Sequence, residues 1–142
     1  MSSTRGTYRV LDFSAFHRTG NYRLRHGSTL SAPFPITEDA WETAIEATLN
    51  AFYGLRCGFP VPDVQDACHL DVFAEHNKER RPVGGGWHDA ANLTQGPYRT
   101  HLSAYALIEL HDALLRRNRT VLAERALEEA LWGLDWSMRT PR

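Results

Sequence analysis

Two cysteines and two histidines in the middle of this chain carry the donor atoms of a possible metal site. They are Cys57, Cys68, His69 and His88. Two thiolates and two imidazoles form the ligand set of a tetrahedral structural zinc site. The spacing departs from that of a zinc finger, because Cys68 follows Cys57 by eleven positions and His88 follows His69 by nineteen. A disulfide, a redox pair and two inert buried thiols therefore remain open as alternatives for the cysteines.

His88 belongs to a glycine-rich run, Gly84-Gly85-Gly86-Trp87-His88-Asp89, with Asn92 three positions beyond Asp89. Successive glycines let the backbone adopt conformations closed to other residues and approach a ligand closely. If a helical turn begins near Asp89, the side chains of Asp89 and Asn92 share a face and could hold one water between them. Asn92 can orient a water but cannot deprotonate it, because an amide does not accept a proton. An ordinary turn and a helix N-cap at Asp89 are the alternatives.

Two further residues near this segment are weaker candidates for the same site. Asp71, two positions after His69, could orient a ligand imidazole, although an exposed carboxylate is the commoner role. His101 is close in sequence to Asp89 and could point into the same cleft. The other histidines are scattered, and no metal role is predicted for them.

The elements that must position these residues are mainly helical. Thr37 is a plausible N-cap for a helix that continues to about residue 53, and further helices are predicted over residues 99–115 and 120–138. The apolar faces predicted to point to the core are Trp41, Ile45, Thr48, Leu49 and Phe52 in the first helix, Leu102, Ala106, Leu110 and Leu114 in the second, and Leu127, Leu131, Leu134 and Met138 in the third. Trp132 and Trp136, four positions apart, are predicted to stack there.

The chain before residue 37 has a different pattern. Alternating apolar residues predict short strands over residues 7–13, 21–25 and 31–36, the last as an edge strand because Pro33 and Pro35 cannot donate ladder hydrogen bonds. So few strands are marginal in water, and we expect them to be part of a larger sheet or to lean on the rest of the chain. Residues 54–98 show little periodicity yet are too apolar for disorder, so something should pin this long segment.

Composition narrows the function classes. The chain has 142 residues, of which 42% are hydrophobic and 23% charged, and its formal net charge is -1. These values are typical of a soluble globular protein and give no electrostatic argument for binding nucleic acid or membrane. The sequence contains no apolar stretch of transmembrane length and no signal peptide. As written, the chain is expected to be cytoplasmic or incomplete at its start, and its parent protein could be secreted.

Four ordered blocks of this sequence resemble the glycoside hydrolases of family 9, the inverting cellulase-type enzymes. The blocks are Phe52-Tyr53-Gly54-Leu55-Arg56-Cys57-Gly58, Ala67-Cys68-His69-Leu70-Asp71, Gly85-Gly86-Trp87-His88-Asp89-Ala90 and Ala130-Leu131-Trp132-Gly133-Leu134-Asp135-Trp136. The resemblance covers roughly residues 37–142. Residues 1–36 look like the last strands of the immunoglobulin-like domain that often precedes the catalytic domain in this family.

The resemblance implies a fold and a set of residue roles. Residues 37–142 would hold about the first three of the twelve helices of an (α/α)6 toroidal barrel, and residues 1–36 a remnant of a β-sandwich. Cys57, Cys68, His69 and His88 would be the ligands of a structural zinc ion. Asp89 matches the aspartate that helps hold the nucleophilic water, and Asn92 occupies the place of the general base.

Two departures from the family bear on activity. Losing a general base, as at Asn92, typically costs ~10²–10⁴-fold in rate. The general acid of the family is a glutamate far beyond residue 142, and an inverting glycosidase needs both carboxyl groups, roughly 6.5–9.5 Å apart. The sequence therefore predicts a fragment of a hydrolase of β-linked glucan or a related oligosaccharide, such as a chitin-derived sugar, inactive without the rest of the catalytic domain. The alternative is a catalytically impaired, zinc-stapled carbohydrate-binding or scaffold module.

Overall fold

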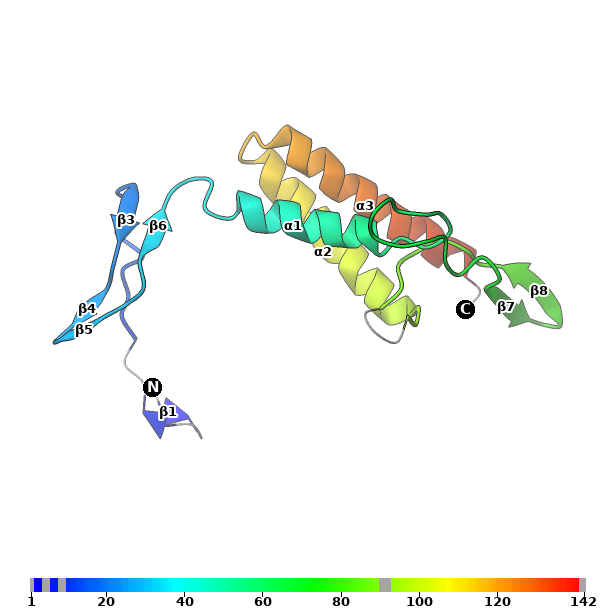
Figure 1. Cartoon of the computed structure of the whole chain (residues 1–142), viewed down its shortest axis with the longest axis horizontal. Helices are drawn as coiled ribbons and strands as arrows, with labels where there is room; N and C mark the ends of the chain where they lie inside the picture. The colour runs from blue at the N-terminus through cyan, green and yellow to red at the C-terminus, as the bar shows by residue number, and fades with distance from the viewer. Residues whose placement is uncertain (1, 4–5, 8–9, 90–92, 141–142) are drawn as a thin grey trace. The chain divides into compact units, whose positions relative to one another are not determined.

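The structure is a computed structural model that describes residues 2–3, 6–7, 10–89 and 93–140. The chain divides into two compact units, Met1–Glu42 and Thr43–Arg142, and each is described by itself. The first unit is built of short strands and the second mainly of helices (Figure 1).

Within its described residues, the first unit contains three antiparallel strand pairs. The strands are β1 Ser2–Ser3, β2 Gly6–Thr7, β3 Gly20–Tyr22, β4 Arg25–His26, β5 Thr29–Leu30 and β6 Phe34–Ile36. They pair as β1 with β2, β3 with β6 and β4 with β5. The edge position predicted for the third strand is confirmed, because β6 pairs with β3 alone among the strands that the structure describes. The prediction of a strand over residues 7–13 is wrong for residues 10–13, which are not in a strand.

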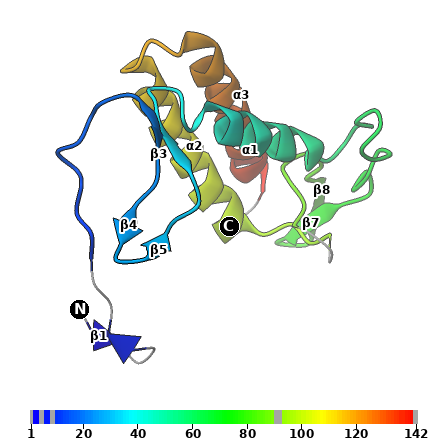
Figure 2. The same ribbon diagram turned by 60° about the vertical axis from the view of Figure 1, so that its left-hand side comes forward.

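In the described part of the second unit, three helices form the framework: α1 Glu42–Gly54, α2 Pro97–Leu115 and α3 Thr120–Arg139. Proline at the first position of α2 suits a helix start, because its missing N–H has no partner there in any case. α2 and α3 form an antiparallel pair closed by residues 116–119, and α1 lies alongside them (Figures 1 and 2). The predicted cap at Thr37 is wrong, because turns occupy residues 38–41 and α1 begins only at Glu42.

The core lies between the helices, and each predicted apolar face is only partly confirmed: in α2, for example, Leu114 is buried and Leu110 packs against the core as expected. Ile45, Leu49 and Phe52 of α1 point to the core as expected, whereas Trp41 and Thr48 are exposed. The buried positions of α2 and α3 are Thr100, Ala104, Leu107 and Leu114, and Leu122, Ala123, Ala126, Glu129, Ala130, Gly133 and Trp136. The predicted Leu102, Ala106, Leu131 and Met138 are exposed. Small residues allow α2 and α3 to approach closely, which leaves Leu102 and Leu131 on the outer faces.

The segment between α1 and α2 contains a β-hairpin that the sequence pattern did not predict. It consists of β7 Phe73–His76 and β8 Glu79–Pro82, paired antiparallel with Phe73 opposite Pro82. Asn77 and Lys78 form the two-residue turn with φ values of 51° and 66°, as type I′ turns require. Across all described residues, no helix combines the length and apolar character needed to cross a lipid bilayer.

Candidate metal centre and the adjoining cavity

The four predicted metal ligands lie together. One donor atom from each of Cys57, Cys68, His69 and His88 lies within 4.8 Å of all the others. The Sγ atom of Cys57 is 3.4 Å from Nδ1 of His69 and 3.3 Å from Nδ1 of His88, and Cys68 Sγ is 3.6 Å from the latter. Both cysteines are free thiols, so the alternative of a disulfide is not realised in this structure.

The spacing of the donor atoms fits a tetrahedral zinc ion. Zn–S bonds of about 2.3 Å and Zn–N bonds of about 2.0–2.1 Å at tetrahedral angles place sulfur and nitrogen roughly 3.6 Å apart. The three sulfur–nitrogen distances of 3.3–3.6 Å in this cluster are close to that separation. The donor set and the geometry therefore suit zinc.

Backbone hydrogen bonds bring three separate segments to this cluster. The N–H of Cys57 donates to the carbonyl of Gly86 over 2.9 Å, and the N–H of His88 donates to the carbonyl of Leu55 over 3.2 Å, on either side of an isolated bridge. The N–H of Gly58 donates to the carbonyl of Cys68 over 3.0 Å. The residues that directly follow α1 thus align both ligand-bearing loops, and the long unpatterned segment is pinned as predicted.

Burial shifts the pKa values of Cys57 and His88 in the directions that favour their neutral forms. Desolvation, reinforced by hydrogen bonding and charge interaction with Cys68, raises the pKa of the Cys57 thiol to about 12. Desolvation, followed by the charge of His69, lowers the pKa of His88. A neutral His88 imidazole is ready to coordinate, whereas the Cys57 thiol needs a metal cation to become a thiolate.

The glycine run approaches helix α3 closely, as its composition predicts. Gly86 has a φ of 69°, and a Cβ there would lie 2.7 Å from the Trp136 ring. The indole N–H groups of Trp132 and Trp136 donate to the carbonyls of Gly86 and Val83, each over 2.8 Å. The two tryptophans therefore hold the loop that carries His88, a role that the predicted stacking did not anticipate.

A buried charge network, which no sequence pattern indicated, fixes the neighbouring Trp87. The guanidinium of Arg56 contacts both carboxylate oxygens of Glu129, at 3.0 Å and 3.1 Å. The same carboxylate accepts a hydrogen bond from the indole N–H of Trp87 over 3.3 Å. Because these residues are distant in sequence and carry no local pattern, only the fold reveals that they meet.

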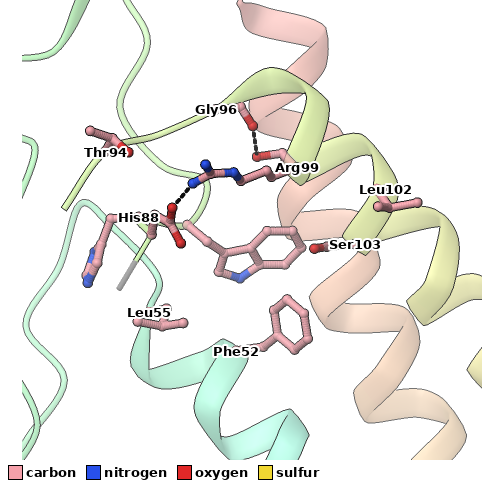
Figure 3. Close-up of a pocket in the computed structure, with 11 residues that line it drawn as sticks. Phe52, Leu55, His88, Thr94, Gly96, Arg99, Leu102 and Ser103 are labelled. Carbon is pink, nitrogen blue, oxygen red and sulfur yellow. Dashed lines mark hydrogen bonds and ion pairs between the residues drawn. The ribbon is translucent and has the colours of Figure 1, made fainter. Parts of the chain in front are cut away.

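Asp89 lies beside the metal cluster and lines a cavity of about 310 Å³. Its side chain is 37% exposed and forms an ion pair with Arg99, in the first turn of α2. Figure 3 shows Arg99 extending into the cavity, while Phe52 of α1 and Leu55, the residue after α1, reach it from another side. Arg99 was not a predicted site residue, and no motif in the sequence singles it out.

The other predicted residues are placed less favourably. Asn92 lies outside the described residues, so the shared face of Asp89 and Asn92 stays a prediction. The cap at α2 is Gly96, not Asp89. His101 is exposed and is not among the described residues that line the cavity. Asp71 is exposed, and Nε2 of His69 instead lies 2.8 Å from the carbonyl oxygen of Leu93.

Comparisons with known proteins found a relative by sequence and solved structures with a similar fold. No protein-family model matches the chain. It is 32% identical over 110 residues to a cellodextrinase of Butyrivibrio fibrisolvens, a match that covers 72% of this chain and 19% of that protein. Two solved structures, the GH family 9 endoglucanase J30 and its Zn-binding triple mutant, share the fold with a TM-score of 0.69, at 22% and 24% identity.

The chain spans only part of these proteins. Each structural match covers 93% of this chain and 30% of the endoglucanase. Within that span, the chain shares the fold of the family 9 endoglucanase and is similar in sequence to the cellodextrinase. The three helices are consistent with part of a helical barrel.

Proposed function

We propose that this chain is the N-terminal part of the catalytic domain of an inverting glycoside hydrolase that acts on β-linked glucan or a related oligosaccharide. The observation that carries the proposal is the position of Asp89. Its partly exposed carboxylate lines a cavity directly beside a four-ligand cluster suited to zinc. The resemblance of the surrounding motif and the relationship to family 9 support this assignment.

The metal centre would be structural in this proposal. Zinc with four protein ligands has no open position for substrate, and it contributes to folding by joining segments that are distant in the chain. Cys57, Cys68, His69 and His88 would hold it, and their loop would keep Asp89 in register. The (α/α)6 barrel, with residues 1–36 as the remnant of an immunoglobulin-like sandwich, completes this proposal.

Asp89 would hold the water that attacks the sugar, and Arg99 would orient its carboxylate through their ion pair. Asn92 would stand at the base position, where it can orient a water but not take its proton. We therefore expect no hydrolysis by this chain alone and a reduced rate in the complete protein.

The proposal is tested by titrating the zinc-loaded chain with cello-oligosaccharides and chito-oligosaccharides while amide NMR shifts are followed. We expect shifts at cavity residues such as Thr94 and Arg99. Asp89→Ala should weaken binding, whereas Asp135→Ala should not, because Asp135 has a similar ion pair with Arg139 on exposed helix surface. Absence of binding by every sugar, or equal loss in both variants, would contradict the proposal. Sequencing the gene beyond the Arg142 codon tests the fragment hypothesis separately.

One observation favours a second function, a zinc-stapled carbohydrate-binding or scaffold module. The Asp89 carboxylate is already engaged by Arg99, an arrangement that would also suit a site that binds sugar without cleaving it. Asn92→Asp in the protein encoded by the complete gene separates the two functions. Restored hydrolysis supports the enzyme, whereas sugar binding without hydrolysis supports the module.

A further inference from the structure

His69 connects the metal cluster to the backbone of Leu93, a short distance after Asp89 in the chain. One ring nitrogen, Nδ1, lies 3.4 Å from Cys57 Sγ inside the cluster. The other, Nε2, lies 2.8 Å from the carbonyl oxygen of Leu93. A metal on Nδ1 leaves the proton on Nε2, so the imidazole then donates a hydrogen bond to that carbonyl.

The three residues from Leu93 to Gln95 are each held by a different part of the site. Leu93 contacts His69 through its carbonyl, and the carbonyl of Thr94 accepts a hydrogen bond of 2.6 Å from the N–H of Asp89. The side chain of Gln95 donates to the carbonyl of Gly85 over 2.7 Å. This segment is therefore tied to the cluster, to Asp89 and to the glycine run.

The backbone at both ends of the His69–Leu93 contact is strained. His69 has a φ of 55° and Leu93 a φ of 51°, in the left-handed region that residues with a Cβ seldom adopt. Such conformations persist only when surrounding interactions over-determine them. A metal on His69 and a hydrogen bond to Leu93 are interactions of that kind.

We propose that His69 is a positioning residue through which the bound metal sets the backbone around Asp89. The metal fixes the ring, the ring fixes the Leu93 carbonyl, and the adjacent Thr94 carbonyl fixes the amide of Asp89. His88 supplies the second constraint by preceding Asp89 directly. This inference rests on the proposed zinc site and adds a route from that site to the water-holding carboxylate.

The test compares two variants with the same donor set. His69→Cys and His88→Cys each leave three thiolates and one imidazole, which still form a complete zinc site. Only His69→Cys removes the donor to Leu93. Zinc content is measured for the 142-residue chain and both variants, and hydrogen exchange of the Asp89 amide is followed by NMR with and without zinc.

We expect zinc to slow exchange of the Asp89 amide in the wild type and in His88→Cys. The zinc-loaded His69→Cys variant should exchange about 3–10-fold faster than the zinc-loaded wild type, the effect of losing one hydrogen bond. Equal protection in the two zinc-loaded variants would overturn the role of His69. A wild type that takes up no zinc would instead overturn the zinc site itself.

A measurement on the wild type alone keeps the inference testable if a variant does not fold. The ¹⁵N spectrum of the zinc-loaded chain reports which His69 nitrogen carries the proton. We expect a protonated Nε2, and a shift of the Leu93 carbonyl ¹³C resonance when zinc is added. An unprotonated Nε2, or a Leu93 carbonyl that does not respond to bound zinc, would contradict the proposal.

Discussion

Gly133 of α3 is where the packing of the site can be tested most sharply. A Cβ at this position would lie 2.3 Å and 2.5 Å from two ring atoms of Trp87, and 3.3 Å from Cγ2 of Thr100. Gly133→Ala must therefore displace Trp87, a buried residue next to His88. The displacement breaks the hydrogen bond from its indole N–H to Glu129, which is 3.3 Å long in the structure.

The expected change in the free energy of unfolding is the sum of two destabilising contributions and one stabilising contribution. Overpacking costs about 1–3 kcal/mol, the lost hydrogen bond to a carboxylate about 1.5–3 kcal/mol, and the better helix propensity of alanine returns about 1 kcal/mol. We expect Gly133→Ala to lower the free energy of unfolding by about 1.5–5 kcal/mol.

The assay is urea unfolding of the zinc-loaded chain, followed by tryptophan fluorescence. Gly54→Ala is the matched control, because its Cβ would meet only Val64 at 3.4 Å and its φ is not in the left-handed region. The control should change the free energy of unfolding by less than about 1 kcal/mol. If Gly133→Ala is as stable as the wild type or more stable, Trp87 does not pack against α3 as described.

Two further predictions concern pH and association. Burial raises the pKa of Glu129, and the Arg56 guanidinium offsets this only in part. The folded state thus binds the Glu129 proton more tightly than the unfolded state does, and this contribution to stability is present at low pH and lost as pH rises through the raised pKa. Relative to Glu129→Gln, the wild type should lose unfolding free energy above about pH 4.5; a relative gain measured in urea would contradict this. The exposed apolar side chains Leu102, Tyr105, Leu131 and Met138 predict concentration-dependent self-association in sedimentation, and a monodisperse monomer would refute it.

The metal cluster could be predicted because the residue types that form it are themselves typical of metal binding. Cysteine and histidine have few roles in common besides metal binding, and a long apolar segment without periodicity needs a constraint. The glycine run was informative for a similar reason, since Gly86 needs both a positive φ and room for Trp136. Helix positions were also accessible, because 3.6-residue periodicity survives in the sequence.

The orientation of the helices could not be predicted from leucine spacing. Ala126, Ala130 and Gly133 form the close contact of α3, whereas the leucines on its other face are partly or fully exposed. A helix with two apolar faces gives no periodic signal for which face is inner. The pairing of Arg56 with Glu129 was equally hidden, because 73 positions separate them and only the packed fold joins them.

Arg99 and the hairpin were missed for different reasons. Arg99 is one of many scattered arginines, and its significance comes only from its ion pair with Asp89. The hairpin turn uses Asn77 and Lys78 without a glycine, so the usual hairpin signal is absent. Neither residue type signals its role in the sequence; the role becomes visible only from the pairing with Asp89 for Arg99 and from the strand pairing for the hairpin.

Metal binding by the whole chain tests the central claim most directly. Purified chain, stripped of metal and titrated with Co²⁺ and Zn²⁺, should bind one ion per chain. The Co²⁺ form should show the absorption of a tetrahedral site with thiolate ligands. Cys57→Ser should lower the affinity by at least about tenfold, whereas His111→Gln, at a histidine outside the cluster, should leave it unchanged. A chain that binds no metal, or that binds it equally well without Cys57, would contradict the account.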